Sequence, residues 1–209
     1  MNQIKFYRNI QTPYKKSLIY TRLGYEKTNT RLESGKKKEI DKWITEAEVL
    51  CKVDIIFWMV EITNIEKNAI ILENSERIVS SSLSALLQHS NEAVLMAATS
   101  GPRITDEIKQ LQQKGEMAKA LVYDAAASEI TDAGLDWLMS FLRQRFIREG
   151  KVLTHMRYSP GYGDLDLTNQ DIFYRWLNLK DWGIKITPKY MLIPEKTVTA
   201  IVGVESSKN

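Results

Sequence analysis

The apolar residues of this chain recur at three- and four-residue intervals in several stretches, the spacing that lines them along one face of a helix. The clearest case has apolar residues at positions 40, 43, 44, 47 and 50. Together with the turn formers that interrupt it, the pattern predicts helices over residues 14–23, 40–50, 76–87, 104–111, 117–148 and 168–182. Ser75 and Thr168 stand where the N-caps of two of these helices are expected.

Runs rich in β-branched and aromatic residues predict the strands. The longest run is VDIIFWMVEI at residues 53–62, and its partner at 68–72 follows a turn near 64–67. The other predicted strands are residues 92–98, 151–156, 189–193 and 197–204. Because these segments do not alternate strictly with helices, we predict an α+β fold with a twisted, mainly antiparallel sheet. The longest helix, 117–148, is expected to pack across that sheet.

Glycine and polar segments interrupt the pattern without marking a linker between domains. Gly134 lies inside the longest predicted helix, where glycine costs about 1 kcal/mol relative to alanine, so a kink or close packing is expected there. Residues 26–35 read as a polar connection that leads into the solvated basic run 36–38. A length of 209 residues suits one domain. Within it, residues 1–65 would form a helical extension and the first strand, and residues 66–209 the remainder.

Composition narrows the possible function classes. A net charge of +3 is too small to indicate a nucleic-acid partner. One cysteine, Cys51, and two histidines, His89 and His155, exclude an internal disulfide and leave no cluster that suggests a metal site. The N-terminal residues MNQIKFYRN lack the apolar run of a signal peptide, and no stretch approaches the roughly 18–20 apolar residues of a membrane span. We therefore expect a cytoplasmic protein with no membrane partner.

The segment RYSPGYGD, residues 157–164, combines loop formers with groups that can bind a ligand. Gly161 and Gly163 permit backbone conformations that let peptide N–H groups point into a shared concavity. Arg157 offers a planar fork for a carboxylate or phosphate, and Tyr162 offers a ring face for a cation or a base. On composition alone an ordered turn is favoured over a ligand cradle, and both interpretations remain open.

The same segment carries a resemblance to a known family. RYSPGYGD, then a predicted helix and ITPKYMLIPEKTVTAIVGV, resembles the C-terminal half of the reactivation domain of cobalamin-dependent methionine synthase. It resembles the small free-standing versions of that domain still more closely. Upstream, EAVLMAATSGPRITDEIKQLQQKGEMAKALVYDAAASEITD is also similar to the free-standing group. The resemblance covers roughly residues 70–204 and implies the α+β fold of that domain.

The resemblance implies a binding site for S-adenosylmethionine. In the family this ligand remethylates cobalamin, after a flavodoxin-type donor has reduced the cobalt. The positions that match the family's ligand motif are Arg157, Ser159, Gly161 and Tyr162, with Pro160 and Gly163 beside them. A family acidic residue on the long helix falls at Asp136, with Asp132 as a rival. Arg157 would hold the carboxylate of the methionine part, and one of these aspartates would hold its ammonium group.

The chemistry implied by the resemblance needs no catalytic residue from this chain. The methyl group passes from the sulfonium to cob(I)alamin, so the protein orients the reactants and excludes water. The chain lacks an Asp-x-His-x-x-Gly cobalamin motif, so cobalamin would arrive on a partner. The resemblance therefore implies a reactivation module for a corrinoid-bearing methionine synthase that lacks this domain.

The chain departs from the family pattern in two places, and these keep alternatives open. A family tyrosine in the last strand falls near Val202, which removes one expected ligand contact. Residues 1–65 do not match the family, and the family's early acidic ligand has no counterpart there. One alternative is reactivation of another corrinoid methyltransferase. A second, favoured by Val202, is a non-catalytic docking module that has lost ligand binding. A conventional small-molecule methyltransferase would need a glycine-rich first loop, which is absent.

Overall fold

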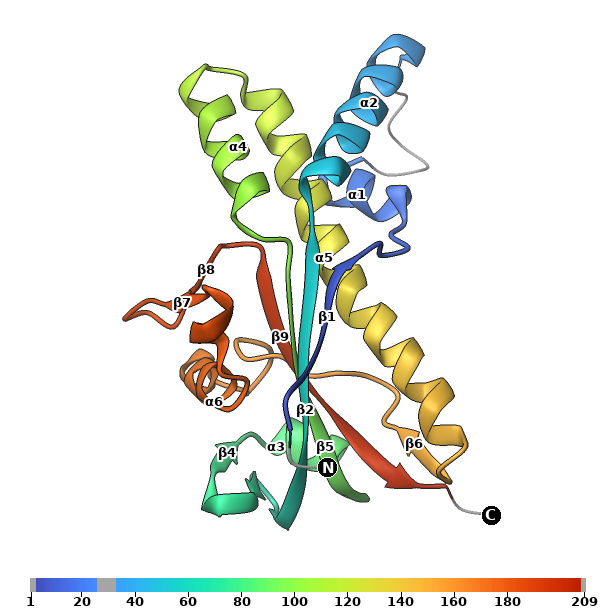
Figure 1. The fold of residues 1–209 in the computed structure, drawn as a ribbon, viewed down its shortest axis with the longest axis vertical. Coiled ribbons are helices and arrows are strands. Elements are labelled where there is room, and N and C mark those ends of the chain that lie inside the picture. Colours follow the sequence, from blue (N-terminus) through green and yellow to red (C-terminus); the bar gives the residue numbers. More distant parts are fainter. Residues whose placement is uncertain (1–2, 26–32, 208–209) are drawn as a thin grey trace.

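A computed structural model describes residues 3–25 and 33–207, and a seven-stranded antiparallel sheet forms its centre (Figure 1). The three longest strands are β2 (Val53–Glu66), β5 (Ser90–Thr99) and β9 (Thr197–Ser206). Strand β5 lies between the other two and pairs with both along most of its length. The predicted strands 53–62, 92–98 and 197–204 are thereby confirmed, each as part of a longer strand.

Four short strands complete the sheet. They are β1 (Lys5–Ile10), β3 (Ala69–Leu72), β4 (Arg77–Val79) and β6 (Lys151–Leu153). Strands β1 and β3 both pair with the edge of β2 that faces away from β5: β1 pairs along residues 53–57 of β2, and β3 pairs along residues 62–66. Strand β4 pairs with β3, and β6 pairs with the C-terminal part of β9. A separate hairpin joins β7 (Lys185–Ile186) to β8 (Leu192–Ile193). These antiparallel pairings confirm the predicted α+β class.

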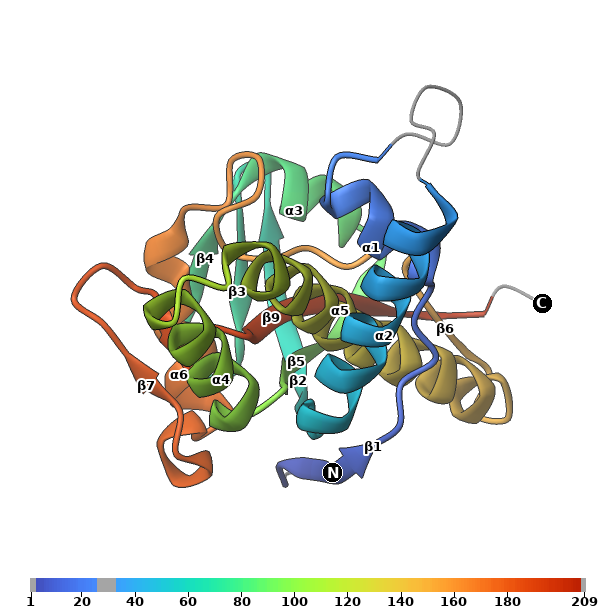
Figure 2. The same cartoon turned by 90° about the horizontal axis from the view of Figure 1, so that it is seen from above.

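Helices cover both faces of the sheet (Figure 2). The described helices are α1 (Lys16–Arg22), α2 (Ser34–Leu50), α3 (Ser81–Leu86), α4 (Pro102–Gln113), α5 (Met117–Ile147) and α6 (Gln170–Trp176). The 31-residue helix α5 packs on one face with α1, α2 and α4. Helices α3 and α6 cover the other face. The prediction of one long helix across the sheet is confirmed.

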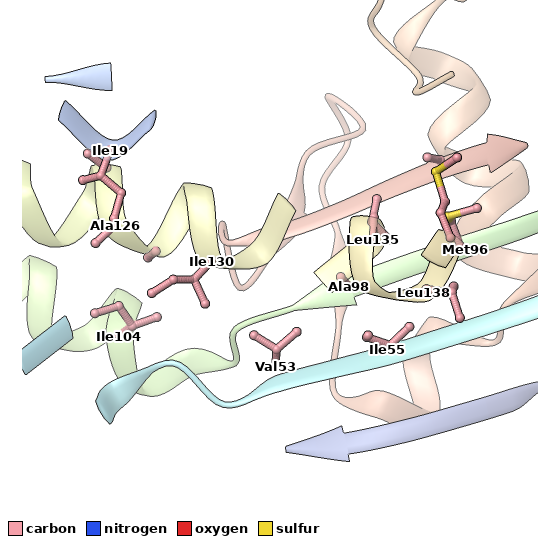
Figure 3. Packing of buried hydrophobic residues seen from close by; sticks show 14 of the residues in the cluster. Ile19, Val53, Ile55, Met96, Ala98, Ile104, Ala126, Ile130, Leu135 and Leu138 are labelled. Carbon is pink, nitrogen blue, oxygen red and sulfur yellow. The ribbon is translucent and has the colours of Figure 1, made fainter. Parts of the chain in front are cut away.

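Alternate residues of β5 supply both cores. Val94, Met96 and Ala98 belong to the cluster under α5. Figure 3 shows Met96 and Ala98 in this cluster, together with Val53 of β2 and Leu138 of α5. The residues between them, such as Leu95, belong to the cluster under α6. A strand buried on both faces needs no polar alternation, which explains the continuous apolar run of this segment.

Gly134 is a site of close packing within α5. A Cβ atom built on it would lie 2.9 Å from Cγ1 of Val53 and 3.2 Å from Cβ of Ala98. The absence of a side chain therefore lets the helix approach β2 and β5 closely. Of the two alternatives expected from sequence, close packing is the one that the structure shows.

The predicted helix over 76–87 is wrong in its first half. Arg77–Val79 is strand β4, with Ile78 opposite Ile70 of β3. Only the middle residue of β4 is buried, which is the two-residue period of a strand rather than a helical face. The helix that follows begins at Ser81, and its cap is the side chain of Ser80, which accepts a hydrogen bond from the N–H of Leu83. Ser75 is therefore not the cap.

Other boundaries also differ from the predictions. The predicted strand 189–193 is instead the turn and second strand of the β7–β8 hairpin, with Tyr190 at a φ of 60°. The predicted helix 168–182 ends at Trp176, and a 3-10 turn (Leu179–Trp182) follows it. Strand β1 was not predicted, because its sequence KFYRNI lacks a clear apolar alternation. The basic run 36–38 lies inside α2, and part of the predicted connection 26–35 lies outside the described residues.

Candidate ligand-binding site

The loop of residues 157–164 is fixed to the sheet at its start. Tyr158 forms an isolated antiparallel bridge with Ile201 of β9: each N–H donates to the other residue's carbonyl oxygen at 2.8 Å. Because Arg157 directly precedes this bridge, its backbone is held against a central strand. The side chain of Arg157 is half-buried.

The loop is fixed to α3 at its other end. Asp164 Oδ1 accepts from the hydroxyl of Ser80 at 2.6 Å, and Oδ2 accepts from the N–H groups of Ser81 and Ser82 at 2.6 and 3.1 Å. These hydrogen bonds, the Ser80 hydroxyl first, lower the pKa of Asp164 to about 2. The loop is therefore an ordered structure tied to two elements that are distant in sequence.

The two loop glycines serve the loop's own geometry. The N–H of Gly161 donates to the carbonyl of Leu165 at 2.8 Å, and the N–H of Tyr162 donates to the carbonyl of Ser159 at 3.1 Å. The N–H groups of Gly161 and Tyr162 are therefore used within the loop and do not form the expected concavity of peptide N–H groups. Gly163 has a φ of +51°, and a Cβ there would lie 2.2 Å from the hydroxyl oxygen of Tyr158. Glycine at 163 is required so that the tyrosine can pack against the loop.

A cavity of about 530 Å³ lies between α5 and this loop, and we call it the α5–loop cavity. Its lining residues are Asp132, Asp136, Met139, Ser140, Arg143, His155, Met156, Arg157, Tyr158, Ser159 and Tyr162. The first five follow one another along α5 at intervals of one to four residues, so one face of the helix forms a wall. The remaining residues come from the segment that follows β6.

Opposite charges meet on the wall of the cavity. Arg157 forms an ion pair with Asp136 Oδ1 through one terminal nitrogen, and its other terminal nitrogen lies 4.0 Å from Asp132 Oδ1. The side chain of Asp136 is 68% exposed, whereas that of Asp132 is 37% exposed. The wall therefore places the Arg157 guanidinium and two carboxylates within reach of a single small molecule, and Arg143 adds a second guanidinium to the lining.

The structure brings most of the predicted site residues together. Those that line the cavity are Arg157, Ser159, Tyr162, Asp136 and Asp132. Tyr162 is 72% exposed, so its aromatic ring lies at the rim of the cavity. Pro160, Gly161 and Gly163 are in the same loop but do not line the cavity. Val202 is fully buried in the core under α5 and is also absent from the lining.

The other six lining residues had no role predicted from the sequence, although one of them, Tyr158, lies within the segment RYSPGYGD. Met139, Ser140 and Arg143 could have been found by extending the spacing of Asp132 and Asp136 along the same helical face. His155 and Met156 carried no such signal, because only the chain's path from β6 to β9 brings them beside α5.

Neither a metal site nor a membrane-spanning helix is found among the described residues. Across residues 3–25 and 33–207, no group of three or more histidine, cysteine, aspartate or glutamate side chains is arranged to hold a metal ion. Within the same residues, no helix is both long enough and apolar enough to span a membrane.

Comparison with known proteins identifies the fold. No protein-family model matches the sequence, and no curated protein matches it. Among solved structures, the chain is similar to the crystal structure of the MetH reactivation domain bound to AdoHcy. The match covers 100% of this chain and 80% of that one, with a TM-score of 0.69 and 12% sequence identity. The chain therefore has the fold of the MetH reactivation domain.

Proposed function

We propose that the α5–loop cavity binds S-adenosylmethionine and that the chain is a reactivation module for a cobalamin-dependent methionine synthase. The observation that carries this proposal is the ion-paired cluster of Arg157, Asp136 and Asp132 on the cavity wall. The amino-acid end of the ligand bears a carboxylate and an ammonium group. The guanidinium of Arg157 suits the first, and an aspartate suits the second.

The residues present fit the rest of the ligand. A volume of about 530 Å³ falls within the roughly 300–1,000 Å³ of small-molecule sites. Tyr162 supplies an exposed aromatic face at the rim, on which an adenine ring can stack. Ser159 also lines the cavity, and Gly161 belongs to the turn that carries Ser159 and Tyr162. The fold is that of a protein solved with AdoHcy, the demethylated form of the same ligand.

In this proposal the chain binds and orients, and the ligand supplies an activated methyl group on its sulfonium. No side chain has to act as nucleophile or base. Arg157 and an aspartate hold the amino-acid end, and the loop limits access of water to the sulfur. Cobalamin reaches the site on a corrinoid-bearing methionine synthase that lacks this domain, and a flavodoxin-type donor reduces the cobalt.

Calorimetric titration tests the ligand. Wild-type protein should release or absorb heat with S-adenosylmethionine, and Arg157→Ala should weaken binding by about tenfold or more, because a hydrogen bond to a charged group is worth about 1.5–3 kcal/mol. Arg77→Ala is the matched control, since Arg77 pairs with Glu66 at 2.7 Å on another part of the sheet. Absence of heat from wild-type protein at millimolar ligand would refute the proposal.

The same titration addresses the docking-module alternative, which the valine at position 202 favours. A module that has lost its ligand should bind a corrinoid protein without S-adenosylmethionine and without any effect of Arg157→Ala. A methyl-transfer assay distinguishes a methionine synthase partner from another corrinoid methyltransferase. Wild-type protein should restore the methylated cobalamin of a methionine synthase that ends at its cobalamin domain. Restoration of only a different corrinoid methyltransferase would instead support the first alternative.

A further inference from the structure

Arg22, in the last turn of α1, reaches across to α5 beside the cavity. Its Nε donates to Glu129 Oε2 at 3.2 Å, and a terminal nitrogen donates to Asp132 Oδ2 at 2.5 Å. Glu129 is buried and fixes one side of the guanidinium, because the planar fork of arginine holds both carboxylates in a set geometry. The pKa of Arg22 is raised: burial lowers it, but the hydrogen bonds that Arg22 donates to Glu129 and Asp132 more than offset this effect, and Arg22 stays charged.

The contacts form a row of alternating charges. Its order is Glu129, Arg22, Asp132, Arg157 and Asp136. Asp132 is shared: Oδ2 pairs with Arg22, and Oδ1 lies 4.0 Å from Arg157. Within the described part of the chain, Asp136 has an ion pair with Arg157 alone. The two aspartates at the cavity wall are therefore not equivalent.

We infer that Arg22 is a positioning residue for the ligand: it holds Asp132 as a fixed support for Arg157 and leaves Asp136 to receive the ligand's ammonium group. This inference rests on the proposed function and deepens it. Asp132 is neutralised from one side, whereas the more exposed Asp136 can exchange its partner. It also gives the N-terminal segment a role, because residue 22 lies more than 100 positions before the carboxylates it holds.

Two thioether nucleosides provide the test. S-adenosylhomocysteine carries the amino-acid end, and 5′-methylthioadenosine lacks it, while neither bears the sulfonium charge. In Arg22→Gln, Asp132 loses its support and competes for Arg157, so S-adenosylhomocysteine should bind about tenfold more weakly, equivalent to about 1.4 kcal/mol. Methylthioadenosine should bind within about twofold of its wild-type affinity. A general structural effect of the substitution would weaken both ligands equally.

Further variants assign the two aspartates. Asp136→Asn should weaken S-adenosylhomocysteine by about tenfold or more, and Asp132→Asn by clearly less. Arg22→Lys should recover part of the loss, because lysine keeps the charge but cannot bridge two carboxylates. Lys16→Gln is the control, since Lys16 is on the same helix and pairs with Asp41 at 3.9 Å, away from the cavity. Equal losses with both ligands, or a larger effect of Asp132→Asn than of Asp136→Asn, would overturn the inference.

A readout without ligand keeps the two proposals distinguishable. If wild-type protein binds neither S-adenosylmethionine nor S-adenosylhomocysteine, the proposed function fails. The ordering role of Arg22 is then read from the NMR signals of the Arg157 guanidinium. These should be dispersed and protected from exchange in the wild type and in Lys16→Gln, and lose both properties in Arg22→Gln. Unchanged Arg157 signals in Arg22→Gln would refute the positioning role.

Discussion

Asp164 ties the loop of residues 157–164 to α3. Its carboxylate accepts three hydrogen bonds, from the cap residue Ser80 and from the first two residues of α3, and it thereby ties two segments that are more than 80 residues apart in sequence. Three donors stabilise the ionised form over the neutral one. The loop should therefore loosen when this carboxylate is protonated.

The pH dependence of stability tests this role. The pKa of Asp164 falls from an ordinary 3.8 to about 2, so its ionised form stabilises the fold above pH 4, and this contribution is lost as the pH falls toward 2. Asp164→Asn should lower the urea midpoint at pH 7, and the difference from wild type should shrink at pH 2–3. Asp106→Asn, at an exposed site on α4, is the control. A difference that persists at pH 2 would contradict the assignment.

Residue patterns alone identified the loop but could not assemble the site. Arg157 and Tyr162 stood out because they lie among glycines and a proline, and the resemblance gave them roles. The aspartates are 21 and 25 positions before Arg157, and no local pattern relates them. Arg22 was missed because its partners lie across the fold, and no short-range rule pairs residues 107 and 110 positions apart.

Among the elements, α5 determines where the cavity forms. One face of its C-terminal half lines the cavity, and its middle packs on β2 and β5 at Gly134. The helix was predictable over its whole length, because the predicted range 117–148 exceeds the observed one by a single residue. Short elements were less so: β4 and the β7–β8 hairpin take their structure from pairing partners rather than from their own sequence.

Substitution of Gly134 tests the close approach of α5 to the sheet. A Cβ at 2.9 Å from a stiff β-branched valine should cost about 1–3 kcal/mol, against a gain of about 1 kcal/mol in helix propensity. Gly134→Ala should therefore lower the free energy of unfolding by up to about 2 kcal/mol.

The control for this prediction is Gly35→Ala in α2. Nothing lies within 4 Å of the added Cβ there, so the substitution should raise the free energy of unfolding by about 0.4–1 kcal/mol. Urea denaturation measures both variants. Stabilisation by both alanines would show that α5 has room at Gly134.

In the molecule as a whole, one sheet separates two hydrophobic cores. Strands β2, β5 and β9 contribute residues to each core, so neither core can form without the same three strands. The antiparallel sheet and its long helix were predictable from pattern. The division of apolar residues between two faces was not, because a continuous apolar run does not reveal which residues point to which side.

Shared strands predict a single cooperative unfolding transition. Leu138→Ala should remove about 2–5 kcal/mol from the core under α5, and Phe173→Ala about 3–5 kcal/mol from the core under α6. Each should shift the whole transition, with circular dichroism and tryptophan fluorescence still coincident. Separation of the two signals in either variant would show that the cores unfold independently.

Because Arg157 forms an ion pair with Asp136, the Asp136 carboxylate competes with the carboxylate of the proposed ligand for the same guanidinium. A tethered group acts at high effective concentration, so an incoming acid must displace a partner that never diffuses away. A simple acid that succeeded would leave Asp136 without a partner, and a simple amine would leave Arg157 without one. A molecule that carries a carboxylate and an ammonium group on one carbon would satisfy both residues, so in the proposed function the pair would select ligands with an amino-acid end.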